Sequence, residues 1–423
     1  MHPLIGIWSD RTGKRKPFIV GGGVAVIISL FVIAWTREIV ELFGGNGKGG
    51  MVAAVAVVFI YILDFGINSV QAAARAFITD NVSLAQQDTG NAWAGRMTGI
   101  GNVIGYTFGY ADLPKRFPFL GDSQLKVLCW LASIGLASSI AIAGSVIRER
   151  PKVKTQDSLG SVFHVCKQLV TTTFELPREI LNICFCQFVN WLGWFPFLFY
   201  MTTYVGEIFV ESVYGDVARI PTHEEDKVLW EEATRIGSLA LLLYACVSLI
   251  SSILLPLIVI PAFSHDETLK DRYPFSWLSL RRLWSISQII YAVAMFSTFF
   301  VYSPSHAIIL TAMCGLSSTV SLWAPFALVS GEISKDGVES DLRKKAGIIL
   351  GIHNSFISAP QLLMTIVSSL IFKLLAPDPN DDGARDTSIA WMLRLGGVCA
   401  LCASYMATKV RDEIDEGEDR RTV

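Results

Sequence analysis

Ten long apolar runs constrain this chain more than any other feature of its sequence. A helix needs about 20 such residues to cross the ~30 Å hydrocarbon core of a bilayer. Backbone groups in lipid must be hydrogen-bonded within the protein, and no alternating strand pattern of a barrel is seen, so we expect each run to be a transmembrane helix. The runs are approximately 17–36, 51–74, 91–112, 125–147, 178–204, 236–262, 283–303, 306–330, 346–374 and 388–408.

The composition agrees with a membrane protein. Hydrophobic residues make up 52% of the 423 residues, and charged residues only 17%, whereas a soluble domain usually carries about 25% charge. A net charge of −2 gives no bulk basic signal for nucleic acid. No catalytic motif is present, so we expect neither an enzyme nor a bound metal or cofactor. Cys184/Cys186 and Cys399/Cys402 form close pairs, but without a nearby His or second pair we interpret them as small apolar helix residues.

The distribution of Lys and Arg predicts the orientation of the helices. Alternate loops, together with the C-terminal tail, hold 23 of the 35 Lys and Arg residues, and cytoplasmic loops are the basic ones. We therefore expect both termini on the cytoplasmic side. The longer opposite loops, 205–234 and 376–388, are rich in acidic residues.

The second run carries a polar stripe. Asp64, Asn68, Gln71 and Arg75 are spaced by 4, 3 and 4 residues, which places all four on one helix face. Charges within a membrane span are costly and mark candidate functional sites. A carboxylate facing a water-filled path can bind and release a proton as its surroundings change. The alternative is a structural hydrogen bond to a neighbouring helix.

Polar residues in three later runs, and one residue just before a fourth, are further candidates. In run 91–112, Asn102 and Tyr106 share a face, and a row of glycines (Gly95, Gly99, Gly101, Gly105 and Gly109) predicts close helix packing. Run 178–204 presents Gln187, Trp191 and Trp194 on one face, a mixture suited to carbohydrate or to an interfacial aromatic belt. Arg235 precedes run 236–262. Run 346–374 contains His353, interpreted as a packing residue, and the candidates Asn354 and Gln361.

A segment before the first run combines glycines with charged residues: Gly6, Asp10, Arg11, Gly13, Lys14 and Arg15. This segment resembles the loop between helices 2 and 3 of the major facilitator superfamily. In that family the glycines allow close packing, and the charges hold a cytoplasmic gate.

Within this superfamily the chain resembles the sucrose–proton symporters, including their fungal α-glucoside members. The resemblance rests on the Asp64 stripe with Asp80, on Asn102 and Tyr106, on the Gln187–Tyr200 segment, on Arg235, and on Asn354 with Pro360-Gln361. It implies that Asp64 accepts the proton and touches sugar, and that Arg75 and Arg235 correspond to functional arginines. Two departures, Ala72-Ala-Ala74 and Ile236, argue against plant-like sucrose selectivity.

The resemblance implies a fold of twelve helices in two pseudo-symmetric bundles. Only ten are seen here, because the sequence opens at the end of the expected second helix, and we interpret it as a fragment or a mis-started gene model that does not necessarily transport as given. The expected parts are a partial N-terminal bundle (1–147), a cytoplasmic linker (148–177), a six-helix C-terminal bundle (178–410) and a tail (411–423).

The function implied is symport of a proton with sucrose or a related α-glucoside such as maltose, by alternating access. The expected partners are sugar, protons and lipid. The expected state is a monomer in the plasma membrane, with a vacuolar or other organellar membrane as the alternative. A sugar exporter or organellar carrier of the same fold, or a truncated membrane protein that does not transport, remain as other hypotheses.

Overall fold

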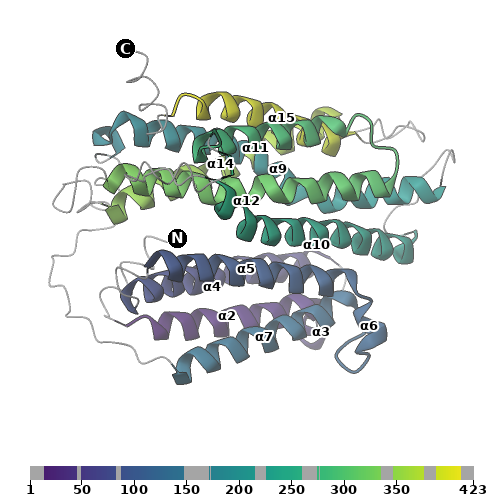
Figure 1. Ribbon diagram of the computed structural model, residues 1–423. Helices are drawn as coiled ribbons and strands as arrows, with labels where there is room; N and C mark the ends of the chain where they lie inside the picture. The colour runs from purple at the N-terminus through teal and green to yellow at the C-terminus, as the bar shows by residue number, and fades with distance from the viewer. Residues whose placement is uncertain are drawn as a thin grey trace, which may run out of the picture. The chain divides into compact units, whose positions relative to one another are not determined.

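A computed structural model describes residues 14–44, 49–81, 87–146, 171, 173–214, 225–259, 274–275, 277–334, 346–375 and 387–410 (Figure 1). Within these ranges the regular elements are all helices. The helices are α2 (Lys16–Ala34), α3 (Thr36–Leu42), α4 (Gly50–Asn81), α5 (Gln87–Tyr110), α6 (Leu113–Arg116), α7 (Gln124–Val146), α9 (Arg178–Tyr214), α10 (Lys227–Ile258), α11 (Leu280–Ser297), α12 (Pro304–Ser334), α14 (Ala346–Leu375) and α15 (Ser388–Ala407).

The prediction of an all-α membrane protein is confirmed. Each of the ten apolar runs coincides with a helix, and in the described part of the chain eight helices are long and apolar enough to cross a membrane. The two long helices outside this set are α5, which is rich in Gly and polar residues, and α11, whose 18 residues include two arginines, Gln288 and several serines.

Three helices extend well beyond the apolar runs that predicted them. Helix α4 continues through the polar segment that ends at Asn81, and α9 continues ten residues past the predicted end, to Tyr214. Helix α10 begins at Lys227, where Asp226 accepts a hydrogen bond from the Leu229 amide at 3.0 Å. Arg235 therefore lies inside a helix and not before one. Hydropathy marks the part of a helix that lipid surrounds, whereas polar turns outside the lipid lack that signal.

The chain divides into two compact units. The N-terminal unit comprises residues 1–97 and 111–164, and the C-terminal unit comprises 98–110 and 165–423. The second half of α5 is thus grouped with the C-terminal unit.

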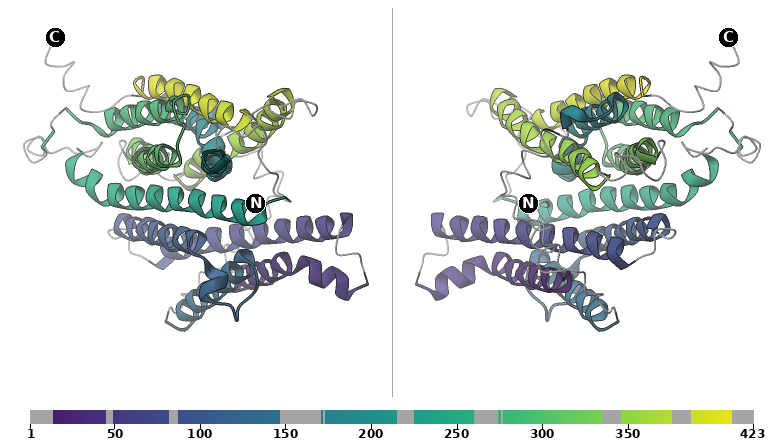
Figure 2. Two further views of the ribbon diagram at one scale, coloured as in Figure 1. Left: turned by 90° about the vertical axis from the view of Figure 1, so that its right-hand side faces the viewer. Right: turned by 90° about the vertical axis from the view of Figure 1, so that its left-hand side faces the viewer.

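In the N-terminal unit, α2 packs against both α4 and α7 (Figures 1 and 2). Gly22 and Gly66 mark the α2–α4 crossing: a Cβ added at Gly66 would lie 2.9 Å from the Gly22 carbonyl oxygen. Ser69 strengthens this contact by donating a hydrogen bond to the Phe18 carbonyl at 3.3 Å. Small residues allow helix backbones to approach closely in a membrane, where no hydrophobic force drives helices together. This crossing therefore fixes the rotation of α4 about its axis.

An ion cluster ties α3 to the start of α7. The Lys126 ammonium contacts the carboxylates of Glu38 and Asp122, the latter at 2.8 Å, and lies 5.7 Å from the Trp35 ring centre. The hydrogen bonds from Lys126 lower the pKa values of Glu38 and Asp122. Both carboxylates are exposed, so the cluster contributes little to stability.

In the C-terminal unit, α9 contacts α10, α12, α14 and α15. A polar turn of α12, residues 317–321, bonds to three of its neighbours. Tyr244 of α10 donates to the Ser318 hydroxyl at 2.6 Å, Gln288 of α11 donates to the Ser321 hydroxyl at 2.8 Å, and Gln187 of α9 donates to the Ser321 carbonyl at 3.3 Å. Buried apolar side chains from the same helices surround this turn.

The Gly22–Gly66 crossing yields a stability prediction. We expect Gly66→Ala to lower the free energy of unfolding by about 1–3 kcal/mol, because its methyl group meets a backbone oxygen that cannot move without separating the helices. The control is Gly21→Ala on α2, where an added Cβ meets nothing within 4 Å. Thermal unfolding of the detergent-solubilised protein measures both. Equal midpoints would show that the helices do not cross at this glycine pair.

The Lys126 cluster predicts a pH dependence. Because the pKa values of Glu38 and Asp122 are lowered in the folded protein, the cluster stabilises above their ordinary values of about 4, and this contribution is lost as the pH falls through the lowered values. We expect Lys126→Met to lower the unfolding midpoint by about 2 °C at pH 7, a gap that closes in acid. Lys115→Met, which removes only the exposed contact with Asp112, is the control. A gap that persists unchanged in acid would contradict the role assigned to the carboxylates.

Candidate functional site

The polar stripe of α4 lies on the side of the helix opposite its contact with α2. Gly66 and Ser69 face α2, whereas Asp64 is two residues from Gly66 and so points about 160° away around the helix axis. Asp64 and Gln71 are exposed, and Asn68 is half-buried. The glycine crossing thus turns Asp64, Asn68 and Gln71 away from the packed side of the N-terminal unit.

Asp64 keeps its carboxylate available. Asn68 donates from its side-chain amide to the backbone carbonyl of Asp64 at 2.7 Å, which is a bond within one helix turn. In the part of the chain that the structure describes, the Asp64 carboxylate itself accepts no hydrogen bond. The alternative interpretation, a structural hydrogen bond to a neighbouring helix, therefore has no support in this part of the chain. Arg75 lies on α4 as predicted, but its side chain is outside the described residues.

Most of the predicted gating loop also lies outside the described residues. Gly6, Asp10, Arg11 and Gly13 precede the first described residue. Lys14 is exposed, and Arg15 is buried directly before α2. The neighbouring Lys16 donates to the Gly144 carbonyl at the end of α7, at 3.1 Å.

Helix α5 presents Asn102 on an exposed surface, while Tyr106, four residues later, packs against the apolar core of the C-terminal unit. The expectation that all five glycines pack closely is met at only two of them. Added Cβ atoms would meet Leu249 at Gly99 and Ser238 at Gly109, each at 3.0 Å, but would meet nothing within 4 Å at Gly95, Gly101 and Gly105. Gly95 shares a helix face with Gly99, so sharing a face with a packed glycine does not by itself bring a neighbour.

The aromatic face of α9 is divided between core and surface. Gln187 is fully buried and accepts from the Asn190 amide at 2.9 Å. Trp194 is only 3% exposed, with its ring centre 4.3 Å from that of Tyr291, which donates to the Gly193 carbonyl at 2.8 Å. These contacts assign packing roles to Gln187 and Trp194 in this conformation. Trp191 is half-buried and is the member of the predicted set that keeps accessible ring surface.

Helix α14 carries a second polar stripe that sequence reasoning identified only in part. Asn354 is half-buried and Gln361 exposed, and both lie on one face with Ser358 and Thr365. The spacing of these four residues is again 4, 3 and 4, the signal from which the stripe could have been found. Both hydroxyls donate to carbonyls of their own helix, Ser358 to Asn354 and Thr365 to Gln361. The two amide side chains are thus the groups of this stripe best able to bond a solute.

The two remaining residues, Arg235 and His353, differ in burial. Arg235 is half-buried on α10. His353 is fully buried, and the Phe326 ring meets it edge-on at 4.6 Å between ring centres. This supports the packing interpretation of His353. In the described residues, no group of three His, Cys, Asp or Glu side chains is arranged to hold a metal ion.

Comparison with known proteins adds relatives along nearly the whole chain. No protein-family model matches it. It is 34% identical over 474 aligned residues to the general alpha-glucoside permease of Schizosaccharomyces pombe, covering 96% of this chain and 83% of the relative. It is 27% identical to sucrose transport protein SUC4 of Arabidopsis thaliana, covering 87% and 73%, and 24% identical to sucrose transport protein SUT5 of rice, covering 96% and 77%.

A solved structure shows the same fold. A bacterial homologue of the human lysosomal transporter Spinster, in an inward-facing and occupied conformation, aligns with a TM-score of 0.51 over 97% of this chain and 83% of its own. The sequence identity is 13%, so this likeness supports the fold alone.

The division of the α9 face predicts that truncating Trp194 and truncating Trp191 lower the free energy of unfolding by different amounts. We expect Trp194→Ala to lower the free energy of unfolding by about 3–5 kcal/mol, because it leaves a cavity beside Tyr291. Trp191→Ala, on the preceding turn, should lower the free energy of unfolding by clearly less, since part of its ring is already exposed. Thermal unfolding in detergent measures both variants. Equal costs would contradict the division of this face into core and surface.

Proposed function

The chain belongs to the family of α-glucoside permeases and sucrose transporters within the major facilitator superfamily, and from this premise we propose that it carries an α-glucosidic sugar across a membrane together with a proton. The sugar class is supported by the fungal permease and the plant sucrose transporters to which the chain is similar. The fungal relative has the higher identity of these. Ala72-Ala-Ala74 and Ile236, which depart from the plant pattern, also favour a broader α-glucoside specificity over a strict one for sucrose.

The observation that carries the proton-coupling proposal is the position of Asp64. It lies in the middle of a helix apolar enough to span a membrane, on the face turned away from α2. A carboxylate held in lipid would be very costly, so this face requires water, solute or another part of a protein. A carboxylate that meets water from alternate sides of the membrane is able to take up a proton on one side and release it on the other.

The proposed mechanism is alternating access. Asp64 binds a proton from outside, sugar then binds to polar groups of the α4 stripe (Asn68, Gln71 and Arg75) and to an aromatic face such as Trp191, and both ligands leave on the cytoplasmic side. Asn102, Arg235, Asn354 and Gln361 are further candidates for sugar hydroxyls. Rigid helical units that move as bodies are the usual means of such exposure.

The driving force is sufficient for concentrative uptake. One proton moving down 100 mV and one pH unit releases about 2.3 + 1.4 kcal/mol. At 1.4 kcal/mol per tenfold, this sustains a sugar gradient of about 500-fold. Loss of a single titrating group would therefore remove accumulation without necessarily removing sugar passage.

The proposal predicts that Asp64→Asn removes proton coupling but leaves sugar exchange. In proteoliposomes with an imposed pH gradient, we expect this variant to lose sugar-driven proton entry and at least about tenfold of sugar accumulation, because an amide does not titrate over this pH range. Exchange of labelled sugar at equal concentrations should persist. The measurement pairs a trapped pH dye with uptake of maltose and sucrose, with lactose as a sugar lacking the α-glucosidic bond.

The matched control is Glu41→Gln, which removes an exposed carboxylate from the short helix α3 outside the membrane spans. It should leave both proton entry and accumulation unchanged. Full proton coupling in Asp64→Asn would remove Asp64 from the mechanism. Coupled uptake of lactose alone would remove the α-glucoside proposal.

A further inference from the structure

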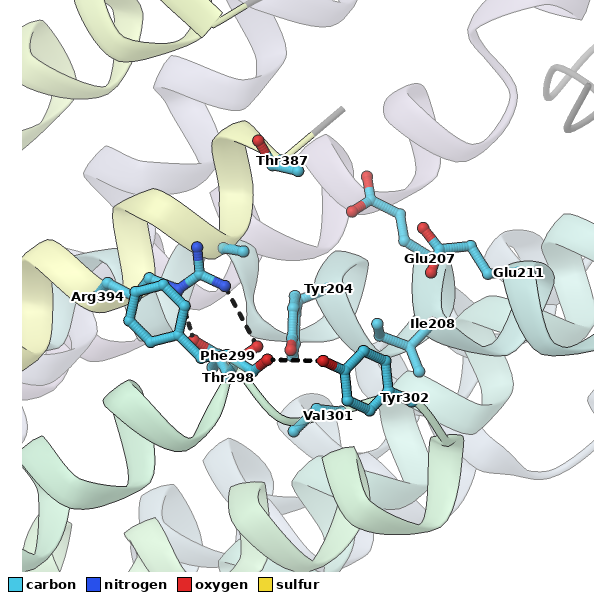
Figure 3. Close-up of a pocket in the computed structure, with 11 residues that line it drawn as sticks. Tyr204, Glu207, Ile208, Glu211, Thr298, Phe299, Val301, Tyr302, Thr387 and Arg394 are labelled. Carbon is cyan, nitrogen blue, oxygen red and sulfur yellow. Dashed lines mark hydrogen bonds between the residues drawn. The ribbon is translucent and has the colours of Figure 1, made fainter. Parts of the chain in front are cut away.

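A hollow of about 100 Å³ lies within the C-terminal unit, away from every residue assigned to transport above (Figure 3). The end of α9, the connection from α11 to α12, and the start of α15 form its walls. Its polar lining includes Glu207 and Glu211 of α9, Tyr302 of the connection, and Thr387 and Arg394 of the α15 wall.

The arginine of this hollow is held in place. Arg394 donates from Nε to the Thr298 hydroxyl at 3.2 Å and from Nη2 to the Thr298 carbonyl at 3.3 Å. Its guanidinium lies 3.7 Å from the ring centre of Phe299 and 4.9 Å from that of Trp391. These contacts, two of them drawn in Figure 3, fix the guanidinium beside exposed aromatic rings, so little conformational entropy would be lost on ligand binding.

The two carboxylates come from successive turns of α9 and share one side of the helix. Figure 3 shows the side chains of Glu207 and Glu211 together at one edge of the hollow, across from Arg394. Tyr302 is 75% exposed, and its hydroxyl donates to the Phe299 carbonyl at 3.3 Å. The lining therefore combines acceptors, a fixed donor and accessible ring faces.

The length of α9 argues that the hollow lies beyond the hydrocarbon core of the membrane. Glu207 lies 29 residues after Arg178, a rise of about 43 Å, which exceeds the ~30 Å hydrocarbon core. The distribution of Lys and Arg predicts that the Arg178 end is cytoplasmic. The carboxylates then stand in the external solution at the opposite end of the helix.

Two simpler explanations account for less of this arrangement. An interfacial aromatic belt explains Phe299, Tyr302 and Trp391, but not two carboxylates and a fixed guanidinium around the same hollow. A divalent cation is a poor match, because only two carboxylates line the hollow and a cationic side chain faces them.

We propose that this hollow is an outer docking subsite for one glucosyl ring of the transported sugar, an inference that rests on the proposed function. Sugar hydroxyls donate to Glu207 and Glu211 and accept from Arg394, while the apolar face of the ring packs on an aromatic side chain. A hollow of this volume is smaller than the ~300–1,000 Å³ of sites that enclose whole ligands. It therefore holds a single ring weakly and raises the local sugar concentration at the external face.

The test requires a readout confined to this site. Maltose is titrated into the purified protein, and hydrogen–deuterium exchange is followed in the peptide covering residues 298–303. We expect maltose to slow exchange there, and Glu207→Gln/Glu211→Gln to raise the concentration at half-effect at least about fivefold. The control is Glu231→Gln/Glu232→Gln, the same change of charge at two exposed carboxylates of α10. Tyr302→Ala gives a second variant should the double variant fail to fold.

The outcomes separate this proposal from the proposed function. Local protection that is absent, or equally strong in the Glu207→Gln/Glu211→Gln variant, overturns the docking subsite even where Asp64-dependent uptake is intact. Local protection that depends on the two carboxylates supports the subsite even where the protein shows no coupled uptake. In transport, the double variant should raise the KM for maltose severalfold and leave the rate at saturating sugar unchanged.

Discussion

A polar group in the membrane cannot be left surrounded by lipid. The packing of α2 on α4 matters for this reason, because it determines which side of α4 faces protein. The close contact between Gly22 and Gly66 fixes which side of α4 is occupied by protein. The remaining side carries Asp64 and its polar neighbours, which lipid alone cannot accommodate. A glycine pair with no chemistry of its own thus determines where the ionisable group points.

In the C-terminal unit, several buried polar side chains are paired with one another. Ser318 and Ser321 of α12 bond to side chains from α9, α10 and α11, and the side-chain amide of Gln187 takes part in that network. Side chains that are already bonded and buried have little left to offer a solute. Gln187 is a core residue for this reason, whereas Trp194 is a core residue because its ring packs against Tyr291; the more accessible Trp191 shares their helix face.

The sequence predicts which residues share a helix face but not which face meets a neighbour. Run length located the ten long helices of the described residues, eight of which are long and apolar enough to cross a membrane. It missed the ends of α4, α9 and α10, where polar turns continue the helix outside the apolar run. Periodicity grouped Asp64 with Gln71 and Gln187 with Trp194, yet one pair is exposed and the other buried. That difference arises from the Gly22–Gly66 crossing and the polar turn of α12, which are tertiary contacts between distant segments.

The stripes on α4 and α14 have the same 4-3-4 spacing but different chemistry. The α4 stripe contains Asp64, whereas the α14 stripe contains only neutral groups, two of which are hydroxyls bonded to their own helix. Only the first contains an ionisable side chain, while the amides of Asn354 and Gln361 offer both donors and acceptors that are independent of pH. In the proposed mechanism α4 therefore supplies the group that binds the proton, and α14 supplies sugar contacts that do not depend on that proton. A substitution on α14 would then weaken sugar binding without uncoupling transport.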